Sequence, residues 1–337
     1  MKILVVASTM VHIKNFHMPY IEEFRNLGHD VRVLASGNEA DFNIPFKKKA
    51  LCFKNLLLAS KIKKILKKEQ FDVIYLHTTL GAFYTRLALK GIKERPYVIN
   101  TVHGYLFSKY EKGIKSNIYL KCEKILKEQT DDIVVMNDED FQIATENSLC
   151  KNKVYKINGM GITLKTKEPL KNNDGLLNLT FVGEISKRKN QALLVKALTR
   201  LPNAMLTLVG DGKERAKIEA LAKKLNVEDR LVITGFTKNV ARYLSKTDIY
   251  VSASKIEGLP FNIMEAMGQG LPIVASKIKG HTDLLSTALL FECDDINSFV
   301  DAIKNTKIEQ KSYDIEKYKL ENVLNDNMKI YLSFINR

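Results

Sequence analysis

Two glutamates, Glu257 and Glu265, stand eight residues apart in the segment Glu-Gly-Leu-Pro-Phe-Asn-Ile-Met-Glu-Ala-Met. Pro260 predicts the start of a helix that ends near Gly268, because proline is favoured in the first helical turn. The first amides of that helix would have no partners within it and would offer a site for a phosphate. Carboxylates repel phosphate, so we expect the glutamates to accept hydrogen bonds from sugar hydroxyls, one from a ribose and one from a hexose. The other residues of this site would be Gly258, Leu259, Phe261 and Asn262.

A second group of residues that could take part in chemistry is the cation cluster Lys187, Arg188 and Lys189. It follows Gly183 and an apolar run at 179–182. We expect these cations to face the same sheet edge as the two glutamates. Cations there would neutralise the negative charge that grows on a departing nucleoside diphosphate. The alternatives are a basic helix start on the surface for the cations and a solvated loop for the glutamates.

His103 is the third candidate. It follows an apolar run at 97–102 and precedes Gly104. A histidine at the carboxyl end of a strand can reach a sugar hydroxyl across a gap between two domains, although a lone histidine is more often structural.

The acidic run 138–140 has the Asp-x-Asp form of some manganese sites. It follows a predicted strand, so we interpret it as the first turn of a helix that Asn137 or the first aspartate caps. We therefore predict no metal there, and no metal cofactor.

Short apolar runs alternate with longer amphipathic stretches along the chain. They predict strands at 3–7, 31–35, 73–76, 97–102, 133–136, 154–157, 179–182, 205–209, 231–234, 249–252 and 272–275. Apolar strands separated by helices are typical of parallel sheets covered on both faces. The sequence therefore predicts an α/β protein of two tandem doubly wound, Rossmann-like domains, residues 1–160 and 161–337, with a cleft between them.

The predicted boundary between the domains is the stretch 158–178, which is rich in glycine and contains Pro169 and the polar run 171–174. The last segment, 313–334, is amphipathic and predicted to be helical. It either closes the second domain or packs back on the first.

The composition indicates which partners the protein favours and which classes of protein are excluded. The net charge of +15 favours anionic partners such as a nucleotide, a nucleic acid or an anionic membrane. Four cysteines without metal-site spacing are typical of reduced thiols in a cytosolic protein. No apolar run approaches the roughly 18 residues of a membrane span, and no nucleic-acid-binding motif is present.

The segment 47–68 carries nine lysines and no acid. In helical register Leu58, Ile62, Ile65 and Leu66 share one face, which predicts packing on the first sheet with the lysines exposed. Each lysine near an anionic membrane surface contributes about 1 kcal/mol of attraction. We therefore predict salt-sensitive peripheral binding at the cytoplasmic leaflet. The lysines are Lys47, Lys48, Lys49, Lys54, Lys61, Lys63, Lys64, Lys67 and Lys68.

These motifs together resemble glycosyltransferase family 4, with the GT-B fold, and its bacterial exopolysaccharide and capsule branch. The similarity covers residues 1–286 and also includes His-Ile-Lys-Asn-Phe-His at 12–17 and Gly-Asp-Gly at 210–212. It implies retaining transfer of a hexose or N-acetylhexosamine from a nucleotide-sugar, by default UDP-linked. The implied acceptor is a growing surface polysaccharide carried on a polyprenyl diphosphate lipid.

The resemblance also assigns roles. Glu257 would contact the donor sugar, Glu265 the ribose and Lys189 the diphosphate, with His103 on the donor sugar from the first domain. The catalytic residues would be His103, Lys189 and Glu257. The donor-binding positions would be Gly183, Arg188, Lys189, Gly235, Phe236, Gly258, Leu259, Phe261, Asn262 and Glu265.

Two positions depart from the family pattern. Glu184 stands where many members have an arginine, so we expect Lys187 or Arg188 to compensate. The Asn-Gly-Val-Asp element appears only as Asn-Gly-Met-Gly-Ile-Thr at 158–163, without its aspartate. A nucleotide-sugar 2-epimerase of the same fold and a non-catalytic homologue remain the alternative functions.

Overall fold

The structure, a computed structural model, describes residues 1–47, 53–110, 113–164 and 175–336. The chain forms two compact units. The first contains Met1–Gly161 and Leu320–Arg337, and the second contains Ile162–Lys319. Pro169 and the run 171–174 of the predicted boundary lie outside the described residues, as do Lys48 and Lys49.

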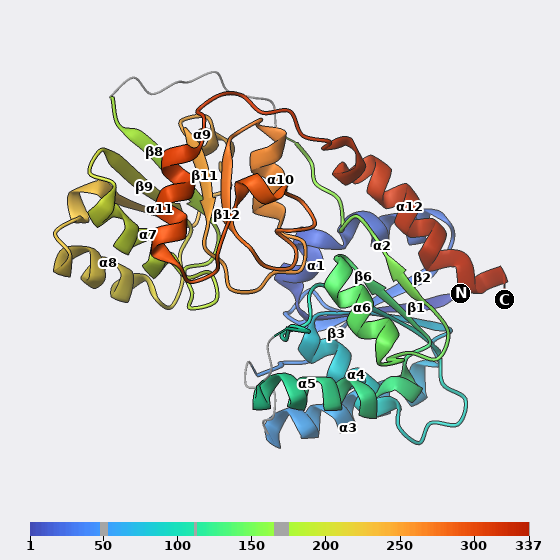
Figure 1. Ribbon diagram of the computed structural model, residues 1–337. Helices are drawn as coiled ribbons and strands as arrows, with labels where there is room; N and C mark the ends of the chain where they lie inside the picture. Colours follow the sequence, from blue (N-terminus) through green and yellow to red (C-terminus); the bar gives the residue numbers. More distant parts are fainter. Residues whose placement is uncertain (48–52, 111–112, 165–174, 337) are drawn as a thin grey trace. The chain divides into compact units, whose positions relative to one another are not determined.

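The first unit is built on a seven-stranded sheet with the order β3-β2-β1-β4-β5-β6-β7 (Figure 1). All neighbouring strands in it are parallel. Its strands are β1 (Lys2–Thr9), β2 (Asp30–Ser36), β3 (Phe42–Asn43), β4 (Val73–His77), β5 (Tyr97–Val102), β6 (Asp132–Val135) and β7 (Val154–Lys156). Its helices are α1 (Met10–Phe16), α2 (Met18–Asn26), α3 (Phe53–Glu69), α4 (Thr79–Leu89), α5 (Ile114–Ile125), α6 (Asp138–Glu146) and α12 (Leu320–Leu332).

The second unit has a six-stranded parallel sheet with the order β10-β9-β8-β11-β12-β13. Its strands are β8 (Leu177–Val182), β9 (Ala204–Val209), β10 (Leu231–Gly235), β11 (Ile249–Ser252), β12 (Ile273–Ser276) and β13 (Leu290–Phe291). Its helices are α7 (Gln191–Ala197), α8 (Arg215–Lys224), α9 (Ala241–Leu244), α10 (Phe261–Gly268) and α11 (Ile296–Asn305).

Strand order reverses once in each sheet, between β1 and β4 in the first and between β8 and β11 in the second. The connections leave these two central strands in opposite directions, which opens a crevice at their carboxyl ends where doubly wound proteins bind ligands. Every predicted strand is confirmed, and so is the doubly wound α/β architecture. The short strands β3 and β13 were not predicted, because two residues cannot show a periodic pattern.

The central strands are buried on both faces, as continuous apolar runs require. In β4 all five residues are buried, and so are all four in β11 and in β12. The prediction that Asn137 caps a helix is also confirmed: its side chain accepts a hydrogen bond from the amide of Asp140 at the start of α6. The acidic run 138–140 is thus the first turn of that helix.

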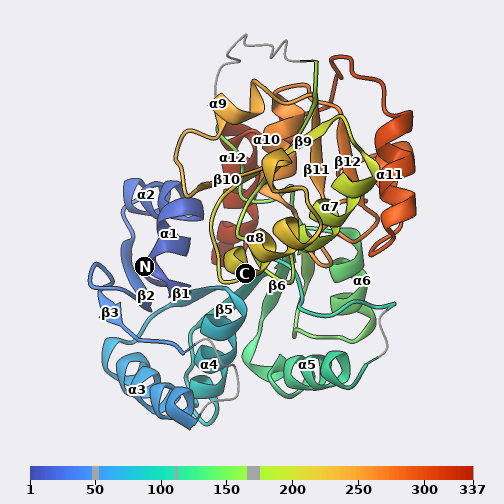
Figure 2. The same cartoon turned by 90° about the vertical axis from the view of Figure 1, so that its left-hand side faces the viewer.

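The lysine-rich helix α3 packs on the first sheet beside α4 (Figure 2). Ile62 and Leu66 are buried in the core of the first unit, and Leu58 and Ile65 pack against it, as the helical register predicted. No helix in the described part of the chain combines the length and apolarity that crossing a bilayer requires.

The terminal helix α12 lies against the first unit, next to α2 (Figure 1). The Tyr75 hydroxyl donates to the carbonyl oxygen of Tyr331, and the Asn327 side chain donates to Tyr20 and to the carbonyl oxygen of Gly159. This answers the question that the sequence left open. The predicted helix start at 313 is wrong: α12 begins only at Leu320, after a 3₁₀ turn at Glu316–Tyr318.

Candidate active site

Lys189 and Glu257 form a buried ion pair at the switch point of the second sheet. Lys189 lies in the loop after β8 and Glu257 in the loop after β11, and these two strands are neighbours. The Nζ of Lys189 is 2.5 Å from Oε1 of Glu257, and the two residues are only 9% and 8% exposed. Arg188, from the same loop as Lys189, donates to Oε2 of Glu257 at 2.9 Å. The structure therefore brings together the cations and the first glutamate that the sequence selected.

The charge balance of this group is unequal, because two cations surround one carboxylate. Burial alone would raise the pKa of Glu257, but the charges of Lys189 and Arg188 and their hydrogen bonds lower it to about 2. Burial lowers the pKa of Lys189, and Glu257 opposes that shift. Glu257 is thus ionised at neutral pH and accepts hydrogen bonds only, while the group retains a positive surplus.

Helix α10 begins where the sequence predicted, with Pro260 as its N-cap and Gly268 as its last residue. The Asn262 side chain in its first turn donates to the carbonyl oxygen of Val182 at the end of β8. The Tyr250 hydroxyl of β11 accepts from the amide of Val182. These bonds hold the amino end of α10 beside the loop that carries Arg188 and Lys189.

Backbone contacts hold together the loops that follow β8, β9 and β10. A Cβ on Gly210 would lie 2.1 Å from the carbonyl oxygen of Gly183, and Gly210 has a φ of 148°, so this position requires glycine. A bridge joins Gly210 to Gly235 at the end of β10. The next residue, Phe236, is 82% exposed and presents a free aromatic face at the same edge of the sheet.

Glu265 occupies a different position from Glu257. It lies about one turn into α10, is half-buried, and lines a depression with Thr163, Lys238 and Gln269. The two glutamates therefore occupy separate places, one in the loop before α10 and one within the helix. Leu259, another predicted site residue, is buried at 7% exposure and contributes packing at the loop.

The sequence did not reveal the residues around Glu257 that follow β11 and β12. His281 follows this strand, is fully buried, and donates from Nδ1 to the carbonyl oxygen of Ser276 at 2.7 Å. Ser254 forms a side-chain hydrogen bond with Glu257. A Cβ on Gly280 would lie 2.4 Å from the carbonyl oxygen of Gly258, so the two loops pack tightly. His281 carries the same signal as His103, a histidine just beyond a buried strand.

The family models decide the class of protein. The model described as "Glycosyl transferase 4-like" matches residues 2–137, and the model described as "Glycosyl transferases group 1" matches residues 163–321. The chain belongs to this glycosyltransferase family. The family membership that the sequence predicted is thereby confirmed. The first match lies in the first unit, and the second match covers the second unit.

Curated relatives of this protein include several bacterial glycosyltransferases. It is 27% identical over 309 residues to the putative glycosyltransferase EpsD of Bacillus subtilis, which covers 84% of this chain and 81% of that protein. It is 26% identical over 263 residues to the UDP-Gal:alpha-D-GlcNAc-diphosphoundecaprenol alpha-1,3-galactosyltransferase of Escherichia coli, covering 71% and 67% of the two chains. The relatives therefore agree with the family models that the protein is a glycosyltransferase.

Among solved structures, the fold matches that of Anabaena HepE in complex with UDP-glucose, with a TM-score of 0.74 and 17% identity over 99% of this chain and 100% of that one. This likeness confirms the GT-B fold. The sequence-predicted His103 of the glycosyltransferase lies in the first unit, just after β5, beside His77 and His12. Its contact with a donor sugar stays a prediction from the family resemblance.

Proposed function

We propose that this glycosyltransferase moves a hexose or N-acetylhexosamine from a UDP-sugar, with retention of configuration, to a surface-polysaccharide acceptor on a polyprenyl diphosphate lipid. The observation that carries the donor part is the positive surplus of Arg188 and Lys189 around Glu257 at the switch point. The amino end of α10 lies beside it. Two cations beside the amino end of a helix suit a diphosphate. The name of the Escherichia coli relative, which includes UDP-Gal and a diphosphoundecaprenol, supports the nucleotide and the acceptor.

Leaving-group stabilisation is the main catalytic effect that these residues would supply. When the bond between the sugar C1 and the diphosphate oxygen breaks, negative charge grows on UDP, and Lys189 and Arg188 would offset it. The acceptor oxygen would attack C1 on the same face, and its proton would pass to the departing phosphate oxygen. No metal enters this scheme.

The remaining site residues would position the donor. Glu257, ionised and buried, would accept hydrogen bonds from sugar hydroxyls, and Glu265 would accept them from the ribose diol. Phe236 would lie against the base with Gly235. Arg188 would take the place expected for the arginine absent at Glu184. Its bond to Glu257 supports this role, whereas Lys187 is exposed and without an ion pair among the described residues.

A donor screen tests this function. The purified protein is incubated with UDP- and GDP-sugars, with and without a lipid-diphosphate saccharide, and products are read by mass. We expect slow UDP release from one UDP-sugar alone and faster release with acceptor, and NMR of the product should show the donor's anomeric configuration. Conversion of UDP-GlcNAc to its 2-epimer without acceptor, or an inverted product, would contradict the proposal.

The first unit offers a surface for the membrane that carries such an acceptor. Lys61, Lys64, Lys67 and Lys68 of α3 are exposed. Helix α5 adds Ile114, Ile118 and Ile125, which are 81%, 45% and 51% exposed and share one helical face. Cations attract anionic headgroups, and exposed apolar side chains insert between them. We therefore infer peripheral binding at the cytoplasmic leaflet through α3 and α5.

Liposome co-sedimentation tests the membrane surface. Binding should need anionic lipid, fall steeply with salt, and drop about tenfold or more in a variant with lysines of α3 changed to glutamine. A matched control changes exposed lysines of α8 in the second unit. Equal binding to neutral and anionic vesicles, or equal loss in the control, would contradict it. In the α3 variant, glutamine replaces Lys61, Lys63, Lys64, Lys67 and Lys68. In the control, glutamine replaces Lys217, Lys223 and Lys224.

A further inference from the structure

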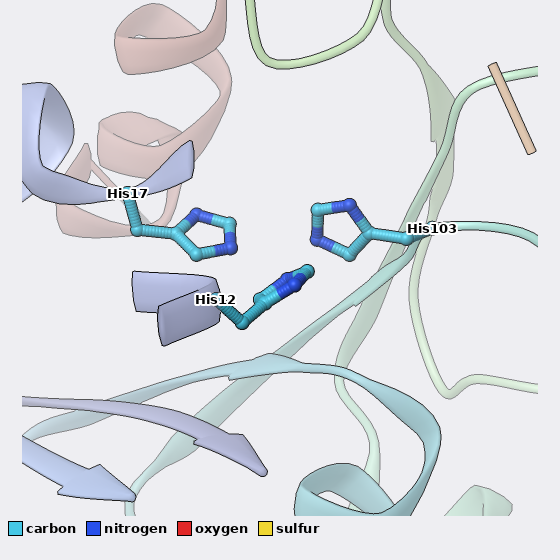
Figure 3. A group of neighbouring side chains, drawn as sticks. All are labelled: His12, His17 and His103. Carbon is cyan, nitrogen blue, oxygen red and sulfur yellow. The ribbon is translucent and has the colours of Figure 1, made fainter. Parts of the chain in front are cut away.

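Four of the six histidines of the chain gather at the carboxyl edge of the first sheet. His12 lies in α1, His17 between α1 and α2, His77 at the end of β4 and His103 just after β5. One ring nitrogen from each of His12, His17 and His103 lies within 4.8 Å of the other two. Figure 3 shows ring nitrogens of His17 and His103 turned toward each other, with the ring of His12 beside them.

The location of this cluster in the fold favours a ligand. The histidines follow β1, β4 and β5, and the strand order of the first sheet reverses between β1 and β4. The carboxyl ends of strands at such a reversal are where doubly wound sheets bind ligands. The corresponding reversal in the second unit carries the Lys189–Glu257 pair, so the histidines occupy the equivalent place in the first.

The cluster is short of hydrogen-bond partners. His17 is only 1% exposed, yet neither of its ring nitrogens has a partner among the described residues. The Nε2 of His12 is also buried and unpaired there. Buried polar atoms nearly always have a partner, so three unpaired nitrogens in one place point to a missing ligand.

The chemistry of the donors selects a cation. A neutral imidazole offers a lone pair, which is the form that binds zinc, copper and nickel. A cluster of only imidazoles, with no carboxylate among its members, suits these ions better than magnesium or calcium, which prefer oxygen.

The spacing is close to that of a metal site. With zinc–nitrogen bonds of about 2.0–2.1 Å, two nitrogens of a tetrahedral site lie about 3.3 Å apart. The nitrogens of His12, His17 and His103 lie within 4.8 Å of one another, so side-chain rotations that bring them closer would place all three around one ion. His77 is hydrogen-bonded to Nε2 of His103 at 3.3 Å and stacks on the ring of His17 at a centroid distance of 3.7 Å, so it supports both rings.

We propose that His12, His17 and His103 bind one divalent transition-metal ion of the zinc type, with His77 beside them supporting the rings of His17 and His103. The ion would tie the α1–α2 corner to the end of β5. The half-buried His12 and His103 leave it a route from solvent. The inference goes beyond the proposed function, because it needs neither the donor nor the acceptor, and it adds a metal that the sequence did not predict.

Metal titration of tag-free protein tests the site. After dialysis against a chelator, Co²⁺ is added and the visible absorption of a tetrahedral nitrogen site is followed. Zinc retained after desalting is counted by mass spectrometry. We expect one equivalent of either ion, competition of Zn²⁺ with Co²⁺, and a thermal unfolding midpoint that rises with Zn²⁺.

Three variants locate the ion. His17→Gln and His12→Gln should lower Co²⁺ affinity at least about 100-fold, whereas His29→Gln, the matched control away from the cluster, should bind as the wild type does. Circular dichroism checks that each variant folds. If His17→Gln fails to fold, His12→Gln, at a half-buried position, still decides.

Absence of both the cobalt spectrum and retained zinc in the wild type would overturn the proposal, and so would loss of binding in His29→Gln alone. Because the readout is metal content, it stands apart from the donor screen. A protein that transfers sugar but binds no metal refutes only this site.

Discussion

Replacing Glu257 by glutamine should lower the stability of the second unit in a way that depends on pH. The carboxylate is 8% exposed and lies between Lys189 and Arg188. Its pKa falls from an ordinary 4.5 to about 2 on folding. A group whose pKa is depressed by folding contributes stability above its unfolded pKa and loses it as the pH falls toward the folded value.

The size of the stability contribution follows from the pKa shift of Glu257. A pKa lowered by about 2.5 corresponds to about 3 kcal/mol at pH 7, since each pKa unit is 1.36 kcal/mol. By pH 3 about 2 kcal/mol of this contribution should be gone. The glutamine variant lacks the titrating group, so the stability gap between wild type and variant should shrink by about 2 kcal/mol between pH 7 and pH 3.

Urea unfolding with hydrogen exchange measured in peptides of β11 assigns the transition to the second unit. Glu292→Gln is the control, because this carboxylate is exposed, pairs with Lys277 on the surface, and should change stability by less than about 0.5 kcal/mol at any pH. A gap for Glu257→Gln that stays constant from pH 7 to pH 3 would refute the reasoning. It would mean that the loss is one of packing and not of a buried ionised pair.

Three further outcomes are expected. Glu265→Ala should weaken UDP binding about 10–100-fold in calorimetry, the cost of one charged hydrogen bond, and unchanged affinity would remove Glu265 from the ribose. Lys189→Met should lower kcat about 100-fold or more while circular dichroism shows a folded protein, and near-native turnover would point to Arg188 instead. Gly210→Ala should lower the unfolding midpoint of the second unit, because its Cβ would overlap the carbonyl oxygen of Gly183; a wild-type midpoint would contradict that geometry.

The architecture was predictable because parallel strands buried on both faces leave continuous apolar runs, as in β4 and β11. Some element boundaries were not predictable, because tertiary contacts determine them. The start of α12 at Leu320 is an example, since the amphipathic pattern begins at 313 but the chain there first makes a 3₁₀ turn. Tyr313 donates its hydroxyl to Leu271 instead of continuing a helix.

The donor site was predictable where spacing along one segment mattered, as for Pro260, Glu257 in the loop before α10 and Glu265 within that helix. That Lys189 pairs directly with Glu257 was not, because 68 residues separate them and only the adjacency of β8 and β11 joins them. His77 gave no signal of its own, and His17 stood out only as part of the segment 12–17 that resembles the family. Their significance appears only when three strand ends bring four imidazoles to one place.

The return of α12 makes the second unit an insertion within the first. The chain crosses between units twice, and the two crossings run side by side: Ile162 is bridged to Lys319, and the Cα of Leu320 lies 2.6 Å from where a Cβ on Gly161 would stand. Cutting at both crossings would therefore leave ends that a short linker can rejoin. Residues 1–161 fused to 320–337 should form an excisable minimal domain, whereas 1–161 alone would leave Tyr20 and Tyr75 without the helix that covers them.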